Sequence, residues 1–169
     1  MPAVGIEAKW YISGMANLDE LIATEGQREP YQIIMDIEQA LNQKSARVGE
    51  QNLSEEERTV LAIEALEQEV NNGGYGQFFT NSSNEYAPMI VGAVSRIGCP
   101  KTAEITRRAV SALDLDEMTP EALDDKLSSG NDELDRALDE CDQSYYKSGE
   151  DIAGRLFEFV KANRESIQF

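Results

Sequence analysis

Histidine is absent from this chain, and its absence excludes several kinds of catalytic site. A serine or cysteine nucleophile commonly relies on an imidazole base, and di-iron helical bundles take Glu-x-x-His motifs from two helices. A metal site made of carboxylates alone stays open, but Asp114 and Asp116 lack the central glycine and later ligands of a calcium loop. We therefore expect no enzyme activity, no cofactor and no metal.

Cysteine is scarce, and long apolar runs are missing. Cys99 and Cys141 lie far apart in the sequence without a Cys-x-x-Cys pair, and the N-terminus carries no signal-like apolar stretch. This pattern predicts two free thiols in a reducing, cytoplasmic environment. No run approaches the roughly 18 apolar residues of a membrane span, and an acidic surface is repelled by anionic lipid headgroups, so we expect no membrane partner.

Basic residues are few, at 15 against 32 acids, which gives a net charge of -17. Binding to a nucleic acid is not expected, because attraction to phosphate requires clustered Lys and Arg. Solubility alone calls for a net charge of about 2 to 8 on a small domain. The excess indicates a positively charged partner, although the ordinary proteins of a halophile would be equally acidic.

What the sequence does contain is enough apolar material for a core. The 169 residues, 18.8 kDa in mass, are 41% hydrophobic and include five Phe and six Tyr. A disordered acidic tail would lack such aromatics. We predict one acidic domain over residues 1–169, with the N-terminal 15 or so residues less ordered.

Helix start and stop signals recur along the whole chain, and no alternation of period two is found. Ser54 and Glu57 form the clearest start, a capping box followed by a wide apolar face, and that helix is predicted to stop at residues 71–74. A further helix is expected from about Glu85 to Gly98. Other predicted starts are Asn17, Pro30, Thr102, Thr119 and Asn131, and a last helix carries Ile152, Leu156, Phe159 and Val160. The sequence thus predicts an all-α protein of seven or eight helices.

Acidic residues concentrate between Ser111 and Asp151, where fourteen acids and three bases give a net charge of -11. Four of them recur at spacings of three, four and three, which places them on one helical stripe predicted to face water. One strand of a DNA duplex presents a phosphate every ~3.4 Å, so its linear charge density is comparable with that of this helical stripe. The predicted partner-binding carboxylates are this stripe, Asp132, Asp135, Asp139 and Asp142, with Asp114, Asp116, Glu117, Asp124 and Asp125 beside it.

An ordinary solvated helix face is the simpler explanation for such a stripe. Against that explanation, like charges four residues apart destabilise a helix by about 0.2 to 0.5 kcal/mol per pair. Asp135 and Asp139 form such a pair. This pair therefore slightly destabilises its helix, so a role in stability does not explain it.

A glycine-rich segment begins with Asn71, Asn72, Gly73 and Gly74 and continues to Ser83. It has no third glycine where a phosphate-binding loop needs one. With its order Asn-Gly-Gly-aromatic-x-Gln-aromatic-Phe-x-Asn-Ser, the segment resembles the signature of a bacterial family of small acidic proteins that includes a DNA mimic. The signature residues with an expected structural role, in the turn, the core or its hydrogen bonds, are Asn72, Gly73, Gly74, Tyr75, Gln77, Phe79 and Asn81.

The resemblance implies an all-helical homodimer whose acidic surface occupies the DNA-binding site of a helix-turn-helix transcription factor. Together with the charge, it favours a non-enzymatic regulator that prevents a basic DNA-binding protein from binding DNA. Two alternatives remain: an enzyme or small-ligand binder built around Tyr75, Gln77 and Asn81, with acidity serving solubility, and a purely structural or assembly protein.

Overall fold

The computed structural model describes residues 17–169, so the expectation of a less ordered N-terminus lies outside the described residues. The described part is all-α, without a strand, as the sequence predicted, and forms one compact domain. Its α-helices are α1 (Leu18–Ile22), α2 (Pro30–Val48), α3 (Glu55–Thr80), α4 (Ile90–Arg96), α5 (Pro100–Leu113), α6 (Pro120–Leu127), α7 (Asp132–Tyr146) and α8 (Ile152–Ala162). Three short 3-10 helices, η1 (Glu50–Asn52), η2 (Ser82–Tyr86) and η3 (Arg164–Ser166), lie between them or at the end.

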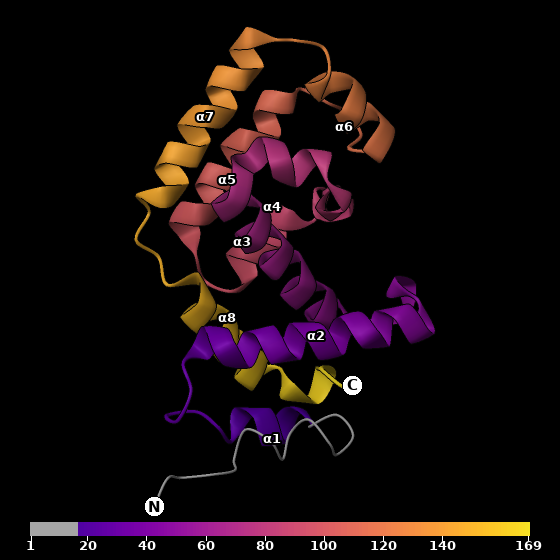
Figure 1. The fold of residues 1–169 in the computed structure, drawn as a ribbon, viewed down its shortest axis with the longest axis vertical. Helices are drawn as coiled ribbons and strands as arrows, with labels where there is room; N and C mark the ends of the chain where they lie inside the picture. The colour runs from indigo at the N-terminus through magenta and orange to yellow at the C-terminus, as the bar shows by residue number, and fades with distance from the viewer. Residues whose placement is uncertain (1–16) are drawn as a thin grey trace, which may run out of the picture.

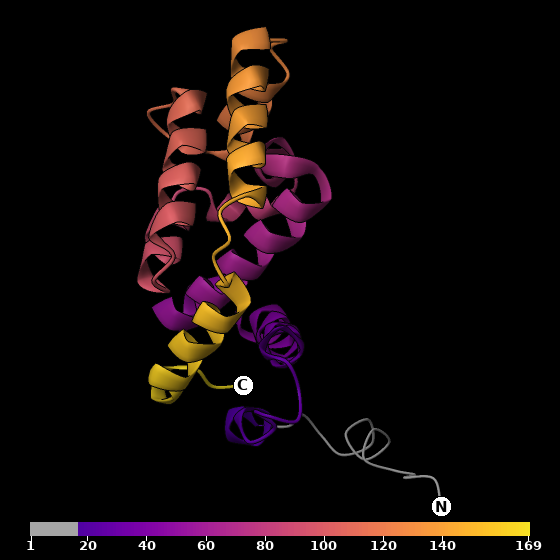
Figure 2. The same cartoon turned by 90° about the vertical axis from the view of Figure 1, so that its left-hand side faces the viewer.

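The helices form an elongated molecule with two distinct ends. Figure 1 shows α1, α2 and the C-terminus at one end and α6 with the start of α7 at the other. The long helix α3 connects the two ends, and α5 packs beside α7 (Figure 2). The C-terminal part of the chain returns to the first end, where α8 packs against α2.

The core is built around α3, whose aromatic residues after the glycines are fully buried. Tyr75, Phe78 and Phe79 have no exposed surface, and the hydroxyl of Tyr75 lies 2.8 Å from that of Thr106 on α5. From α2, Ile33, Ile34 and Ile37 pack into the same core. Cys99 and Cys141 are also buried and are not bonded to each other, as expected for free thiols.

Most predicted helix starts are confirmed by their caps. The side chains of Asn17, Ser54, Thr119 and Asn131 each accept a hydrogen bond from a backbone N–H in the first turn that follows. Pro30 is the first residue of α2. These starts were predictable because a cap and the N–H groups that it satisfies lie within three residues of each other.

The predicted cap at Thr102 is wrong. Helix α5 begins two residues earlier, and Thr102 is buried in its first turn. The free N–H groups there are satisfied from the α7–α8 connection, where the carboxylate of Glu150 accepts hydrogen bonds from Lys101 N (3.0 Å) and Thr102 N (2.8 Å). These bonds lower the pKa of Glu150, although its partial burial opposes them. The cap therefore comes from a residue almost fifty positions away.

The predicted helix stop at residues 71–74 is also wrong in part. Gly73 and Gly74 leave helical geometry, but the chain resumes the helix at once and α3 ends only at Thr80. The helix predicted from about Glu85 is likewise divided into the 3-10 helix η2 and then α4, which starts at Ile90. The glycines thus produce a kink within α3.

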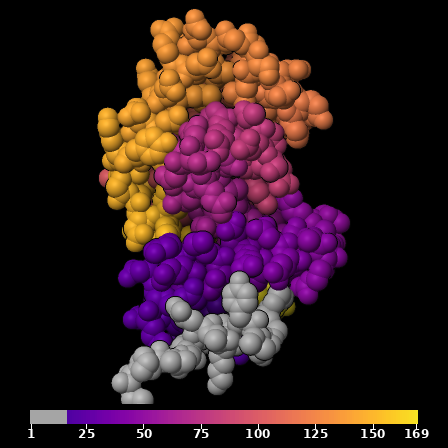
Figure 3. Space-filling view, in the orientation of Figure 1, coloured from indigo at the N-terminus to yellow at the C-terminus, as the bar shows by residue number. Residues whose placement is uncertain are grey.

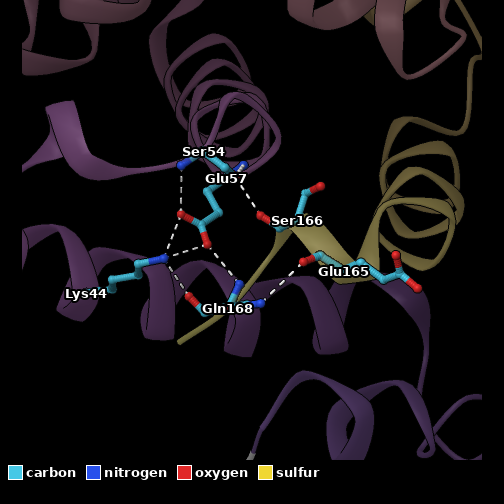
Figure 4. Close-up of polar contacts among 6 residues, drawn as sticks. All are labelled: Lys44, Ser54, Glu57, Glu165, Ser166 and Gln168. Atoms are coloured by element: carbon cyan, nitrogen blue, oxygen red, sulfur yellow. Dashed lines mark hydrogen bonds and ion pairs between the residues drawn. The ribbon is translucent and has the colours of Figure 1, made fainter.

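The C-terminal residues are fixed to α2 and to the start of α3 by a buried carboxylate (Figure 4). Glu57, 1% exposed, accepts hydrogen bonds from Lys44 Nζ at 2.7 and 2.9 Å and from the backbone N–H of Gln168 at 2.8 Å. Lys44 also donates to the carbonyl of Gln168, and the hydroxyl of Ser54 donates to the carbonyl of Ser166. These contacts hold α2, the start of α3 and the C-terminal residues together at the end of the molecule opposite α6.

Candidate partner-binding surface

Eight of the nine carboxylates predicted to bind a partner are exposed and gather at one end of the molecule. We call this set the acidic end: Asp114, Asp116 and Glu117 from the α5–α6 connection, Asp124 and Asp125 from α6, and Asp132, Asp135 and Asp139 from α7. The segments that carry it cover the top of the molecule in Figure 3. The structure therefore places these segments at the same end of the molecule, with α6 and α7 on opposite sides of it (Figure 1).

No residue of the acidic end forms an ion pair within residues 17–169. The ion pairs within the described residues use other acids, such as Glu55 and Glu56, which both bind Arg96. The three bases of the segment, Lys126, Arg136 and Lys147, take part in none of these pairs. Arg136 donates instead to the backbone carbonyl of Asp132. With fourteen acids against three bases, the segment keeps a net negative charge, whose field extends into solvent over a Debye length of about 10 Å at 0.1 M salt.

Some of these acids have a local structural role. Asp132 and Asp135 lie in the first turn of α7, where a negative charge interacts favourably with the helix dipole by about 0.3 to 1 kcal/mol. Asp114 ends α5 in the left-handed region (φ 49°), which Asp tolerates better than most residues.

Three other acids of this end, Asp124, Asp125 and Asp139, are not placed to stabilise a helix. Asp124 and Asp125 lie in the second half of α6, toward the helix end at which the dipole disfavours negative charge. Asp139 follows Asp135 by one turn in the middle of α7. The stability of these helices therefore does not account for their presence.

The prediction that Asp142 faces water with the rest of the stripe is wrong. Its side chain is half-buried against the kink of α3, and Oδ1 accepts a hydrogen bond from the backbone N–H of Tyr75 at 2.8 Å. Burial raises the pKa of Asp142, the bond from Tyr75 lowers it, and the nearby charge of Asp139 raises it. Helical periodicity placed this residue on the correct stripe, but the stripe passes under α3 at its C-terminal end.

Six of the seven signature residues lie in structural positions of the kind predicted, and the prediction for Asn72 is wrong. Gly74 has φ +81°, a conformation that favours glycine, and a Cβ on Gly73 would lie only 2.0 Å from Oε1 of Gln77. Gln77 and Asn81 both donate to the carboxylate of Glu69, at 2.6 and 2.9 Å. Of the remaining signature residues, Tyr75 and Phe79 are fully buried, whereas Asn72 is exposed and its side chain makes no hydrogen bond with any described residue.

The best-formed hollows of the described surface lie away from the signature. Two shallow hollows open on the described surface, one around Lys44, Ser54 and Gln168 and one between Arg96 and Phe159. Neither is lined by Tyr75, Gln77 or Asn81, the residues named for a ligand-binding alternative. Within residues 17–169, no group of three or more Cys, Asp and Glu side chains is arranged to hold a metal ion. No helix in this range is long and apolar enough to cross a membrane.

A second group of carboxylates, on the inner side of α3, was missed by the sequence interpretation. Glu64 is buried, and burial, followed by the charges of Glu38 and Glu67, raises its pKa from 4.5 to about 8. Burial also raises the pKa of Glu67 to about 7. A Glu within an apolar face was the only signal in the sequence, and in a chain this acidic it was not distinctive.

Glu64→Gln is expected to make folding less sensitive to alkaline pH. Because the folded protein holds this proton up to about pH 8 and the unfolded chain loses it near 4.5, Glu64 lowers stability progressively as pH rises between these values. The variant should therefore exceed the wild type by about 2 kcal/mol in unfolding free energy at pH 9, and by much less at pH 5, since it never buries the charge. Urea unfolding at both pH values measures this difference. The exposed Glu165→Gln is the control, and an equal pH dependence in all three proteins would contradict the prediction.

Comparison with known proteins returned no match among curated sequences. A family model, described as DMP19-like protein, matches residues 51–163, which include the kinked helix, the signature and the acidic end. The match covers about two thirds of the chain. The chain therefore belongs to the DMP19-like protein family.

Proposed function

We propose that this protein is a DNA mimic that binds the DNA-binding surface of a basic helix-turn-helix transcription factor and thereby blocks its binding to DNA. The observation that carries the proposal is the acidic end, where eight exposed carboxylates gather without an ion pair to any described base. A DNA-binding surface is positively charged, and contacts to phosphate supply most of its sequence-independent affinity. Carboxylates held on helices can accept the same hydrogen bonds from Arg and Lys.

The spacing of the carboxylates supports this substitution. Asp132 and Asp139 are seven residues apart on α7, which corresponds to about 10 Å along the helix axis, with Asp135 between them. Four phosphates of one DNA strand span about 10 Å at ~3.4 Å per step, so the two outer carboxylates match the ends of such a run. Asp124 and Asp125 on α6 provide a second group of charges at the same end of the molecule (Figure 1).

A homodimer acting in the cytoplasm completes the proposal. The family name agrees with a DNA mimic. Tyr31 and Met35, one turn apart on α2, are 53% and 57% exposed, and apolar side chains of this size are enriched in interfaces between subunits. They lie on a helix remote from the acidic end, so the same protomer could bind a second copy and a transcription factor together.

The proposal predicts that the protein displaces a specific protein from DNA. Lysate of the source cell is loaded on immobilised duplex DNA at about 50 mM salt, and the column is then eluted with this protein or with polyglutamate of equal total charge. Only the folded protein should release a helix-turn-helix protein, identified by mass spectrometry. Calorimetry with the purified target should show affinity that falls steeply between about 50 and 300 mM salt, because both surfaces are charged. Equal release by polyglutamate, or no release by either, would contradict the proposal.

A further inference from the structure

We infer that Asp142 is a positioning residue: it fixes helix α7 to the kink of α3 and so determines where the carboxylates of the acidic end are held. The inference rests on the proposed function, because it assigns a role in that same binding surface. It replaces the sequence interpretation of Asp142 as a carboxylate that contacts the partner.

The first contact is a helix cap supplied by another part of the chain. Tyr75 is the first residue after the two non-helical glycines, so its N–H has lost the partner that an uninterrupted helix would provide. Oδ1 of Asp142 accepts this N–H at 2.8 Å across 67 residues of sequence. A carboxylate at the start of a helix segment is favoured by the helix dipole as well.

Gly74 permits this approach. A Cβ at Gly74 would lie 2.1 Å from Oδ2 and 2.6 Å from Cγ of Asp142, far inside van der Waals contact. The residue also has φ +81°, so glycine is required both by the backbone and by the neighbouring carboxylate. The second glycine of the family signature and Asp142 thus form a matched pair that sets the distance between α3 and α7.

Two further contacts hold the same turn of α7. The hydroxyl of Tyr146 donates to the carbonyl of Val70, on the other side of the kink, at 2.6 Å. The ring of Tyr145 packs edge-on against that of Tyr75, with 6.0 Å between centroids. The C-terminal turn of α7 is therefore joined to both halves of α3.

The acidic end lies far enough from this anchor that a small change in the angle of α7 would move its carboxylates appreciably. Asp132 lies ten residues from Asp142, about 15 Å along the helix. A tilt of roughly 10° about the anchor would displace Asp132 by about 3 Å, which is close to the ~3.4 Å step between phosphates. A tilt of this size would be large enough to misalign the carboxylates with groups that bind DNA.

The test compares Asp142→Ala with Asp142→Asn. Asparagine keeps an oxygen that accepts the Tyr75 N–H, whereas alanine removes it. Glu165→Gln, an exposed change in η3, controls for the loss of one charge. Affinity is measured at 10 °C by calorimetry with the target purified from the DNA column. Hydrogen exchange by NMR reports on the Tyr75 amide and on α7.

We expect Asp142→Asn to bind within twofold of Glu165→Gln. Asp142→Ala, and Gly74→Ala through displacement of Asp142, should bind at least tenfold more weakly, with faster exchange in α7.

Each other outcome overturns the inference in an identifiable way. Equal losses for Asp142→Asn and Asp142→Ala would show that the carboxylate contacts the partner directly. Unchanged affinity and unchanged exchange in Asp142→Ala would show that the contact does not hold α7. If the wild type releases nothing from the DNA column, the proposed function fails, while the exchange rates of α7 still decide whether Asp142 anchors it.

Discussion

Asp132→Lys with Asp135→Lys is expected to weaken binding to the target transcription factor by about a thousandfold, roughly 4 kcal/mol. The two substitutions place positive charges on α7 opposite the positive surface that the protein is proposed to bind, and like charges facing each other across an interface cost several kcal/mol. Both side chains are exposed and neither forms an ion pair with a described residue, so the main cost to the fold is the lost dipole interaction in the first turn of α7, about 0.3 to 1 kcal/mol per position. Calorimetry at about 100 mM salt measures the affinity, and circular dichroism verifies the helix content.

A matched control separates the acidic end from net charge alone. Asp19→Lys with Glu165→Lys changes the net charge by the same amount at exposed positions of α1 and η3, at the opposite end of the molecule, and neither residue forms an ion pair with a described residue. This control should lose less than tenfold, because its charges lie beyond a Debye length from the bound surface. Equal losses for the two double variants would mean that only the total charge matters. Unchanged affinity in the first variant would remove the acidic end from the interface.

The parts of the fold that could be predicted from sequence depend on contacts between near neighbours. A cap such as Ser54 satisfies N–H groups two or three residues later, and an apolar face repeats every three or four residues. For this reason the helices and most of their starts are visible in the sequence. The exposure of Asp132, Asp135 and Asp139 follows in the same way, because they lie opposite the buried Leu134 and Leu138 on α7.

What could not be predicted depends on partners distant in sequence. Gly73 and Gly74 are typical of a helix end, yet α3 continues past them because a carboxylate on α7 caps its second half. Glu150 likewise replaces the expected local cap of α5. The spacing of residues on a helix says which face they share, but it does not say which other helix covers the end of that face.

Among the residues that the structure describes, the acidic end forms no ion pair, and composition alone does not give this property. The same number of acids would carry little field if Arg and Lys from other helices packed beside them. Instead, bases such as Arg96 and Lys161 pair with acids of α3, α8 and the α1–α2 connection. The distribution of the pairs, in addition to the net charge, thus makes one end of this molecule suitable for a cationic partner.

At the other end of the molecule, Glu57→Ala is expected to lower the free energy of unfolding by about 3 to 5 kcal/mol. The wild-type carboxylate, 1% exposed, binds Lys44 and the backbone N–H groups of Ser54 and Gln168. Its removal leaves the Lys44 ammonium, whose side chain is 20% exposed, without its negative partner, and breaking a buried pair from one side costs this much. Urea unfolding at pH 7, followed by circular dichroism, measures the loss.

The neighbouring Glu56→Ala provides the comparison, because Glu56 also forms an ion pair, with Arg96, but its side chain is 20% exposed and Arg96 keeps Glu55 as a second partner. That variant should lose no more than about 1 kcal/mol, as is usual for ion pairs near the surface. Carboxypeptidase should also remove the C-terminal residues faster from Glu57→Ala, since Gln168 loses the bond that holds its N–H. A loss below 1 kcal/mol for Glu57→Ala would show instead that α2, α3 and the C-terminus are held together by the packing of Ile167 and its apolar neighbours.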